Sequence, residues 1–107
     1  MNTGLSKEVT AKLAGVLELF PEVESAILYG SRAKGNFKPG SDIDLSLTGQ
    51  VDHATLLKIN HLIDELSLPY FCDVTLFHFI TNQELIEHIL RKGILLYKKS
   101  AVTLPSP

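Results

Sequence analysis

The chain has 107 residues, of which 45% are hydrophobic and 21% charged, and its formal net charge at pH 7 is -2. This length predicts one domain with a modest core, and the apolar runs are too short to cross a membrane. The slightly acidic balance argues against a long DNA or RNA partner, because such binding depends on Lys and Arg neutralising backbone phosphates.

The first half of the chain is expected to alternate helix and strand. Ser6 can cap a helix over residues 7–20, which Pro21 ends. Residues 23–29 are apolar with β-branched and aromatic members, which predicts a strand. After one helical turn at residues 31–35, Pro39-Gly40 predicts a reversal into a second strand at residues 42–47, antiparallel to the first.

The second half repeats the alternation. Asp52 can cap a helix over residues 53–66, and residues 70–78 form a third predicted strand. Thr81 and Glu84 have the spacing of a capping box, which predicts a helix ending near Lys92 before Gly93. Residues 94–97 can add a short last strand. The inward face of this last helix is expected to carry four residues: Leu85, Ile86, Ile89 and Leu90.

This order of elements predicts an α/β (α+β) fold, in which helices flank a mixed β-sheet of three to four strands. We expect a single domain over residues 1–98, followed by a mobile tail at residues 99–107. The N-terminus lacks the pattern of a signal peptide, and the only cysteine, Cys72, cannot form an internal disulfide. A cytoplasmic location is therefore expected.

Asp42 and Asp44 are the first candidates for chemistry. In a strand, residues two apart point to the same face, so both carboxylates lie together while Ile43 and Leu45 point to the other face. Two neighbouring carboxylates repel each other unless a cation lies between them, and hard oxygen ligands favour Mg²⁺. On its own, however, an Asp-x-Asp pair is more often a solvated turn.

A polar turn precedes this pair. The turn Gly30-Ser31, with Arg32 and Lys34 after it, offers backbone N–H groups, a hydroxyl and positive charge to phosphate oxygens. Alone, such a turn is more often an ordinary loop, and the two cations can equally be plain solvated side chains. Metal ligands and a phosphate-binding turn together indicate a nucleotide.

The coupling of these two motifs is more specific than either motif alone. Ten residues separate Ser31 from Asp42, which resembles the Gly-Ser-x10-Asp-x-Asp signature of the DNA polymerase beta nucleotidyltransferase superfamily. The resemblance covers residues 23–77, and the chain is similar in size to the minimal nucleotidyltransferases (MNT), in particular the MntA-like antitoxins of HEPN/MNT toxin-antitoxin pairs. It implies the nucleotidyltransferase fold.

Asp73 interrupts an otherwise apolar strand. It either lies at a sheet edge or meets the face that carries Asp42 and Asp44, because a buried, unpaired carboxylate is costly. The superfamily has a third carboxylate on this strand, so the resemblance implies that Asp73 completes the site and can help to take the proton of the acceptor.

The resemblance also implies a reaction. An acceptor oxygen attacks the α-phosphorus of a nucleoside triphosphate, with ATP expected, and two Mg²⁺ ions about 3.5 to 4 Å apart clamp the entering and leaving oxygens. Asp42 and Asp44 would bridge the ions, Gly30 and Ser31 would hold the β- and γ-phosphates, and Arg32 and Lys34 would assist electrostatically.

Three functions compete at this point. The first is transfer of AMP to a tyrosine hydroxyl of a HEPN-type toxin partner, by which the chain acts as antitoxin. The second is a stand-alone transferase for a small hydroxylated acceptor such as an aminoglycoside, and the third is an inert, binding-only antitoxin. The acceptor, the preferred base and the oligomeric state stay open.

Overall fold

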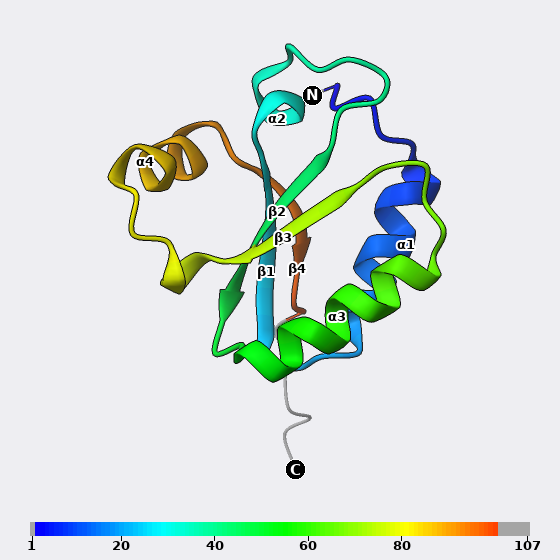
Figure 1. The fold of residues 1–107 in the computed structure, drawn as a ribbon, viewed down its shortest axis with the longest axis vertical. Helices are drawn as coiled ribbons and strands as arrows, with labels where there is room; N and C mark the ends of the chain where they lie inside the picture. Colours follow the sequence, from blue (N-terminus) through cyan, green and yellow to red (C-terminus); the bar gives the residue numbers. More distant parts are fainter. Residues whose placement is uncertain (1, 101–107) are drawn as a thin grey trace.

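The computed structural model describes residues 2–100, which form four α-helices, one short 3-10 helix and four strands (Figure 1). In chain order they are α1 (Lys7–Glu18), β1 (Val23–Tyr29), α2 (Ser31–Lys34), β2 (Ile43–Gly49), α3 (His53–Glu65), β3 (Cys72–Leu76), η1 (Phe77–Phe79), α4 (Gln83–Lys92) and β4 (Ile94–Lys98). Of the expected tail, residues 101–107 lie outside the described part of the chain. Lys99 is paired, because its N–H donates to the carbonyl of Glu24 at 2.8 Å.

The four strands form one mixed sheet in the order β3-β2-β1-β4. β1 runs antiparallel to both β2 and β4, whereas β2 and β3 are parallel. The parallel pair needs a crossover connection, and α3 provides it. The predicted mixed sheet of three to four strands flanked by helices is confirmed, with the antiparallel pairing of the first two strands as expected.

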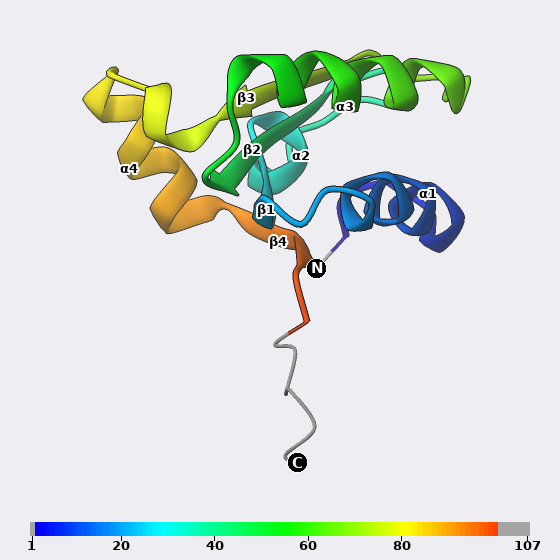
Figure 2. The same ribbon diagram turned by 90° about the horizontal axis from the view of Figure 1, so that it is seen from below.

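The two faces of the sheet differ in what covers them. α1 and α3 pack against each other and against one face, and α4 lies on the other side, next to β1 (Figure 2). The core lies between α1, α3 and the sheet, where Leu13, Leu28, Leu45 and Ile59 are among the fully buried side chains. The opposite face is therefore the one on which polar side chains can lie.

The ends of the helices follow their capping residues. The side chains of Ser6 and Asp52 accept hydrogen bonds from N–H groups in the first turns of α1 and α3, as predicted. In α4 the predicted cap is wrong by one position. Asn82, and not Thr81, is the N-cap, and its side chain accepts from the N–H of Leu85 at 3.0 Å.

Two further local predictions need correction. Leu90 was expected on the inner face of α4, but it is 68% exposed, whereas Ile89 is 2% exposed. The rest of the protein packs against only part of the apolar face of α4, so Leu90, at the edge of that face, stays in solvent. The third strand, expected over residues 70–78, covers only Cys72–Leu76, and η1 takes the place of residues 77 and 78. Within the described residues, no helix is long and apolar enough to cross a membrane.

Candidate functional site

The three predicted carboxylates come together at one end of the sheet. Asp42 directly precedes β2, and Asp44 is the second residue of that strand. In the parallel pairing of β2 with β3, the register partner of Asp44 is Asp73. Both alternatives considered for Asp73 therefore hold, since it lies on the edge strand β3, exposed, and also beside Asp44.

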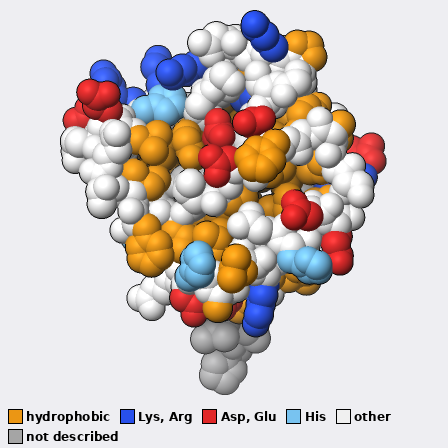
Figure 3. All heavy atoms as spheres, viewed as in Figure 1, with side chains coloured by type: hydrophobic (Ala, Val, Ile, Leu, Met, Phe, Trp, Pro, Cys, Tyr) orange, Lys and Arg blue, Asp and Glu red, His pale blue; other side chains and the backbone are white. Residues whose placement is uncertain are grey.

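The negative charges of Asp42, Asp44 and Asp73 repel one another. Partial burial raises the pKa of the Asp44 carboxyl, and the negative charges of Asp73 and then Asp42 raise that pKa further. In the space-filling view, acidic side chains gather in the upper half of the face shown, with hydrophobic side chains around them (Figure 3). The ionised form of Asp44 is thus destabilised as long as no cation lies nearby.

The donor set has the chemistry of a magnesium site, because it consists of hard carboxylate oxygens with Asp42 and Asp73 exposed to incoming ligands. Within residues 2–100, however, no group of three or more His, Cys, Asp or Glu side chains is already arranged closely enough to hold a metal ion. The residues fit the ion by type and by strand register.

Gly30 joins β1 to α2 beside these carboxylates. Tyr29, the residue before it, is the register partner of Asp44. Gly30 has a φ of 76°, and a Cβ at this position would collide with the Asp44 carboxylate. The positive φ therefore favours glycine here, and a side chain at this position would also require the Asp44 carboxylate to shift.

His88 is a site residue that the sequence analysis missed. The N–H of Gly30 donates to Nε2 of His88 at 2.9 Å, and the His88 ring stands edge-on to Tyr29 with centroids 6.2 Å apart. Burial lowers the pKa of His88, and the charges of Lys34 and Lys92 lower that pKa further. Nε2 accepts a hydrogen bond only in the neutral ring, so these effects support the contact. The one feature of the sequence that could have indicated its role is its position next to Ile89, a residue predicted to lie on the inner face of the last helix.

Arg32 is engaged elsewhere. Its residue exposure is 1%, and its guanidinium donates to three backbone carbonyls: Thr3 at 2.8 Å, Ser41 at 2.9 and 3.2 Å, and Pro39 at 3.3 Å. The rings of Phe37 and Tyr70 lie 5.2 and 4.8 Å from its central carbon. These contacts give no support to the prediction that Arg32 binds the nucleotide, and they indicate that it holds the loop before β2.

Ser31 and Lys34 lie in the single turn of α2 at the same end of the sheet. Ser31 is half-buried and Lys34 is exposed. The N–H groups of Ala33 and Lys34 both donate to the carbonyl of Gly30, which fixes the turn. Gly30 thus lies against Asp44, and Ser31 and Lys34 follow it in the same helical turn, so their contact with phosphate stays a prediction.

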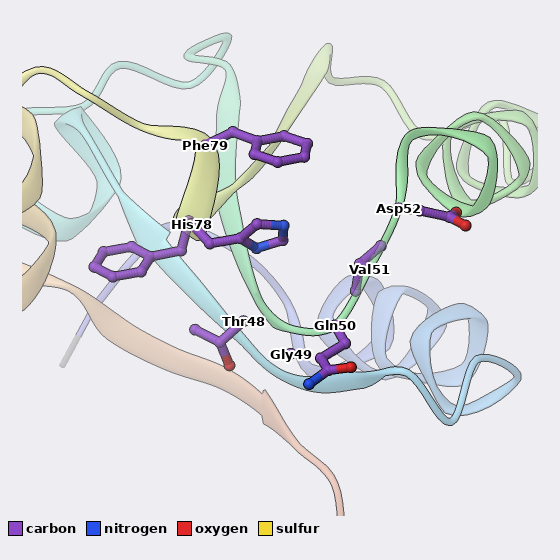
Figure 4. A pocket seen from close by; sticks show the side chains of 8 residues that line it. Thr48, Gly49, Gln50, Val51, Asp52, His78 and Phe79 are labelled. Carbon is purple, nitrogen blue, oxygen red and sulfur yellow. The ribbon is translucent and has the colours of Figure 1, made fainter.

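A cavity lies at the other end of β2, away from the carboxylates. It measures about 460 Å³ and is lined by Thr48, Gly49, Gln50, Val51, Asp52, Phe77, His78 and Phe79 (Figure 4). None of the predicted site residues lines it. Its walls come from the β2–α3 connection and from η1, so the volume of a cavity does not by itself mark the carboxylate site.

Several solved structures are similar to this chain in fold. One solved toxin-antitoxin complex with AMP-PNP has a TM-score of 0.65 at 19% identity, over 89% of this chain and 75% of that chain. A Shewanella oneidensis tri-AMPylated HEPN toxin in complex with MNT antitoxin has a TM-score of 0.64 at 15% identity, over 89% and 74% of the two chains. The toxin-antitoxin MntA-HepT has a TM-score of 0.63 at 16% identity, over 88% and 74%. At these identities the likeness shows the fold.

No curated protein matches the chain significantly. The family described as polymerase beta nucleotidyltransferase matches residues 11–101, which is most of the sequence and includes both the Gly-Ser turn and the three carboxylates. The chain therefore belongs to the polymerase beta nucleotidyltransferase family.

Proposed function

We propose that this chain transfers AMP from ATP to a hydroxyl group, with Mg²⁺ held by Asp42, Asp44 and Asp73. The observation that carries the proposal is the register of β2 and β3, which sets Asp73 beside Asp44 at the end of the sheet where Gly30 and Ser31 begin α2. Burial and then the charges of Asp73 and Asp42 raise the pKa of Asp44, and a bound cation would offset this effect. An AMP-PNP complex among the similar structures supports an adenine nucleotide as substrate.

The reaction is a displacement at phosphorus. The acceptor oxygen forms a bond to the α-phosphorus, the bond from that phosphorus to the oxygen bridging to the β-phosphate breaks, and pyrophosphate leaves with the electron pair. Asp42, Asp44 and Asp73 would hold two Mg²⁺ ions, whose positive charge would polarise the phosphate and lower the pKa of the acceptor hydroxyl. Asp73, exposed at the sheet edge, takes the acceptor's proton. Ser31 and Lys34 hold the phosphate chain, and Gly30 lets it approach the backbone.

The acceptor in this proposal is a tyrosine of a HEPN-type partner protein, and the chain acts as its antitoxin. One similar structure is a tri-AMPylated HEPN toxin in complex with MNT antitoxin, which supports this class of acceptor. Exposure of Asp42 and Asp73 agrees with it, because a side chain protruding from another protein can reach exposed carboxylates. A partner would also orient the attacking oxygen.

The test is co-expression with the product of the neighbouring gene, followed by addition of ATP and Mg²⁺ and mass spectrometry of both proteins. We expect AMP on a tyrosine of the partner, and none with the Asp42→Asn/Asp44→Asn variant. Adenylylation of an aminoglycoside with an unmodified partner would establish the stand-alone transferase instead. A partner that is bound and inhibited equally by the wild type and the double variant, without modification, would establish a binding-only antitoxin.

A further inference from the structure

A second cavity, of about 310 Å³, lies between α2 and α4. Six residues line it: Lys34 from α2, and Glu84, Glu87, His88, Arg91 and Lys92 from α4. None of Asp42, Asp44 and Asp73 lines it. Its volume lies at the lower end of the range for small-ligand sites, which begins at about 300 Å³. In the space-filling view, basic side chains gather at the upper left, in the region between these helices (Figure 3).

The charged side chains that line the cavity are two carboxylates, Glu84 and Glu87, and three cations, Lys34, Arg91 and Lys92. Glu84 lies in the first turn of α4, whereas Arg91 and Lys92 lie in its last turn. Glu84 is seven positions before Arg91, which corresponds to about 10 Å along the axis, and Glu87 is four positions before it, about 6 Å. The ion pairs found among the described residues are Lys12–Glu8 and His61–Glu65, so none of the cations of this cavity is paired there. Unpaired cations in a concave site attract an anion.

His88 connects the cavity to the Gly-Ser turn. It lines the cavity, and its Nε2 accepts the hydrogen bond from the N–H of Gly30 at 2.9 Å. Burial lowers the pKa of His88, and the positive charges of Lys34 and Lys92 lower that pKa further, which indicates that both cations lie near the ring. A phosphate chain that begins at the Gly-Ser turn can therefore continue toward the cations of this cavity.

We propose that Arg91 and Lys92 of α4 bind the terminal phosphates of the nucleotide together with Lys34, and hold the pyrophosphate as it leaves. This inference rests on the proposed function and extends it to a helix outside the Gly-Ser and Asp-x-Asp motifs. Negative charge develops on the leaving group as the bond to the α-phosphorus breaks, so cations there stabilise the transition state. Arg91 can also contact two phosphate oxygens at once.

A purely structural role for the two cations makes a different prediction. Positive side chains in the last turn of a helix stabilise the helix dipole. In that case the loss of Arg91 and Lys92 would lower stability and leave anion binding unchanged. Binding of an inorganic polyphosphate separates the two roles, because it requires neither a base-binding site nor transfer.

The experiment is calorimetric titration of the full chain with sodium tripolyphosphate and, separately, with AMP. For Arg91→Gln/Lys92→Gln we expect tripolyphosphate to bind at least about tenfold more weakly, while AMP affinity changes less than about twofold. Lys12→Gln/Lys58→Gln removes the same charge from exposed positions on α1 and α3 and is the matched control. Equal tripolyphosphate affinities of the two double variants would overturn the proposal.

A second measurement uses only the wild-type protein, so it does not depend on whether the double variant folds. In an NMR titration, tripolyphosphate should shift the backbone amide signals of Arg91 and Lys92 and leave that of Lys58 unchanged. If the signals of Arg91 and Lys92 do not shift, the proposal is overturned. Retained tripolyphosphate binding in a chain that transfers no AMP would refute the proposed function and not the anion site. If the wild-type chain transfers AMP but Arg91→Gln/Lys92→Gln binds tripolyphosphate as tightly as the wild type, the anion site is refuted and the proposed function is not.

Discussion

Arg32 shows how a charged side chain can be stabilised inside a small domain. Burying an unpaired charge is very costly, and the cost falls when every donor finds a partner. Its guanidinium donates to the carbonyls of Thr3, Pro39 and Ser41, which belong to two segments far apart in sequence. The fan-shaped donors of arginine suit several carbonyls at once. Arg32 thereby ties the N-terminal segment to the loop that delivers Asp42.

We predict that Arg32→Lys lowers the free energy of unfolding by about 3 kcal/mol, because one ammonium group cannot replace the separated donors and leaves buried carbonyls unsatisfied. Urea unfolding measures this loss. The affinity of the folded variant for Mg²⁺·ATP should stay within about twofold of the wild type. A stable variant with weak ATP binding would instead return Arg32 to the nucleotide site.

His88 predicts a pH dependence of stability. Its pKa in the folded protein is lowered from the ordinary value of 6.5, so the unfolded chain binds the proton more readily. The contribution of His88 is therefore fully present above pH 6.5 and is lost as the pH falls through the lower, folded pKa. His88→Gln keeps an acceptor for the N–H of Gly30 and cannot titrate.

The measurement is the difference in free energy of unfolding between the wild type and His88→Gln, followed from about pH 8 to pH 5. The wild type should lose stability relative to the variant on acidification. Groups shared by both proteins cancel in the difference, including the nearby Lys34, Glu84, Glu87, Arg91 and Lys92 and the His61–Glu65 pair. Parallel curves would show that the His88 contact does not depend on the charge of the ring.

At the scale of elements, α4 and the crossover helix α3 have different tasks. α3 connects two parallel strands and so brings Asp73 beside Asp44. α4 covers part of the opposite face through Ile89 and presents His88 to Gly30. A ten-residue helix such as α4 is marginal by itself, so its cap and its packing both contribute to keeping His88 in place.

The cap of α4 can be tested directly. Asn82→Ala should lower the free energy of unfolding by about 1 kcal/mol, because the N–H of Leu85 loses its acceptor. Thr81→Ala, one residue earlier, is the matched control and should change stability by less than about 0.5 kcal/mol. Chemical denaturation of both variants measures the difference. A larger loss in Thr81→Ala would support the capping box predicted from Thr81 and Glu84.

At the scale of the whole molecule, the carboxylates lower stability when no cation is present. Burial and the charges of Asp73 and Asp42 raise the pKa of Asp44, which means that its ionised form is less favourable in the folded protein than in the unfolded chain. Stability conferred by a bound ligand offsets this cost, because a ligand that binds only the folded state shifts the equilibrium toward it.

We therefore predict opposite effects of Asp44→Asn with and without ligand. In metal-free buffer the variant should unfold at a higher temperature than the wild type, because the repulsion is removed. With Mg²⁺·ATP at a hundred times its dissociation constant, the wild type should gain about 2.7 kcal/mol and the variant much less. Thermal unfolding in both buffers measures the two effects. If Mg²⁺·ATP stabilises both proteins equally, Asp44 is not a ligand of the metal.

The sequence by itself determined which segments form the α-helices and strands and located their ends to within about two residues, because these depend on neighbours along the chain. Ser6 and Asp52 cap helices through bonds three residues away. The first helix, expected to run to residue 20 before Pro21, ends two residues earlier, at Glu18, with Leu19 as its C-cap. The period of two in a strand was enough to predict that Asp42 and Asp44 share a face. The family signature then linked this pair to Gly30 and Ser31, and their roles in catalysis stay a prediction.

Only the tertiary structure decided which distant segments meet. The pairing of Asp44 with Asp73 depends on the register of two strands joined by a whole helix, and no local pattern fixes that register. The buried position of Arg32, the bond of His88 to Gly30 and the exposure of Leu90 likewise depend on packing between elements. A side chain's type is written in the sequence, whereas its partners and its solvation are properties of the folded chain.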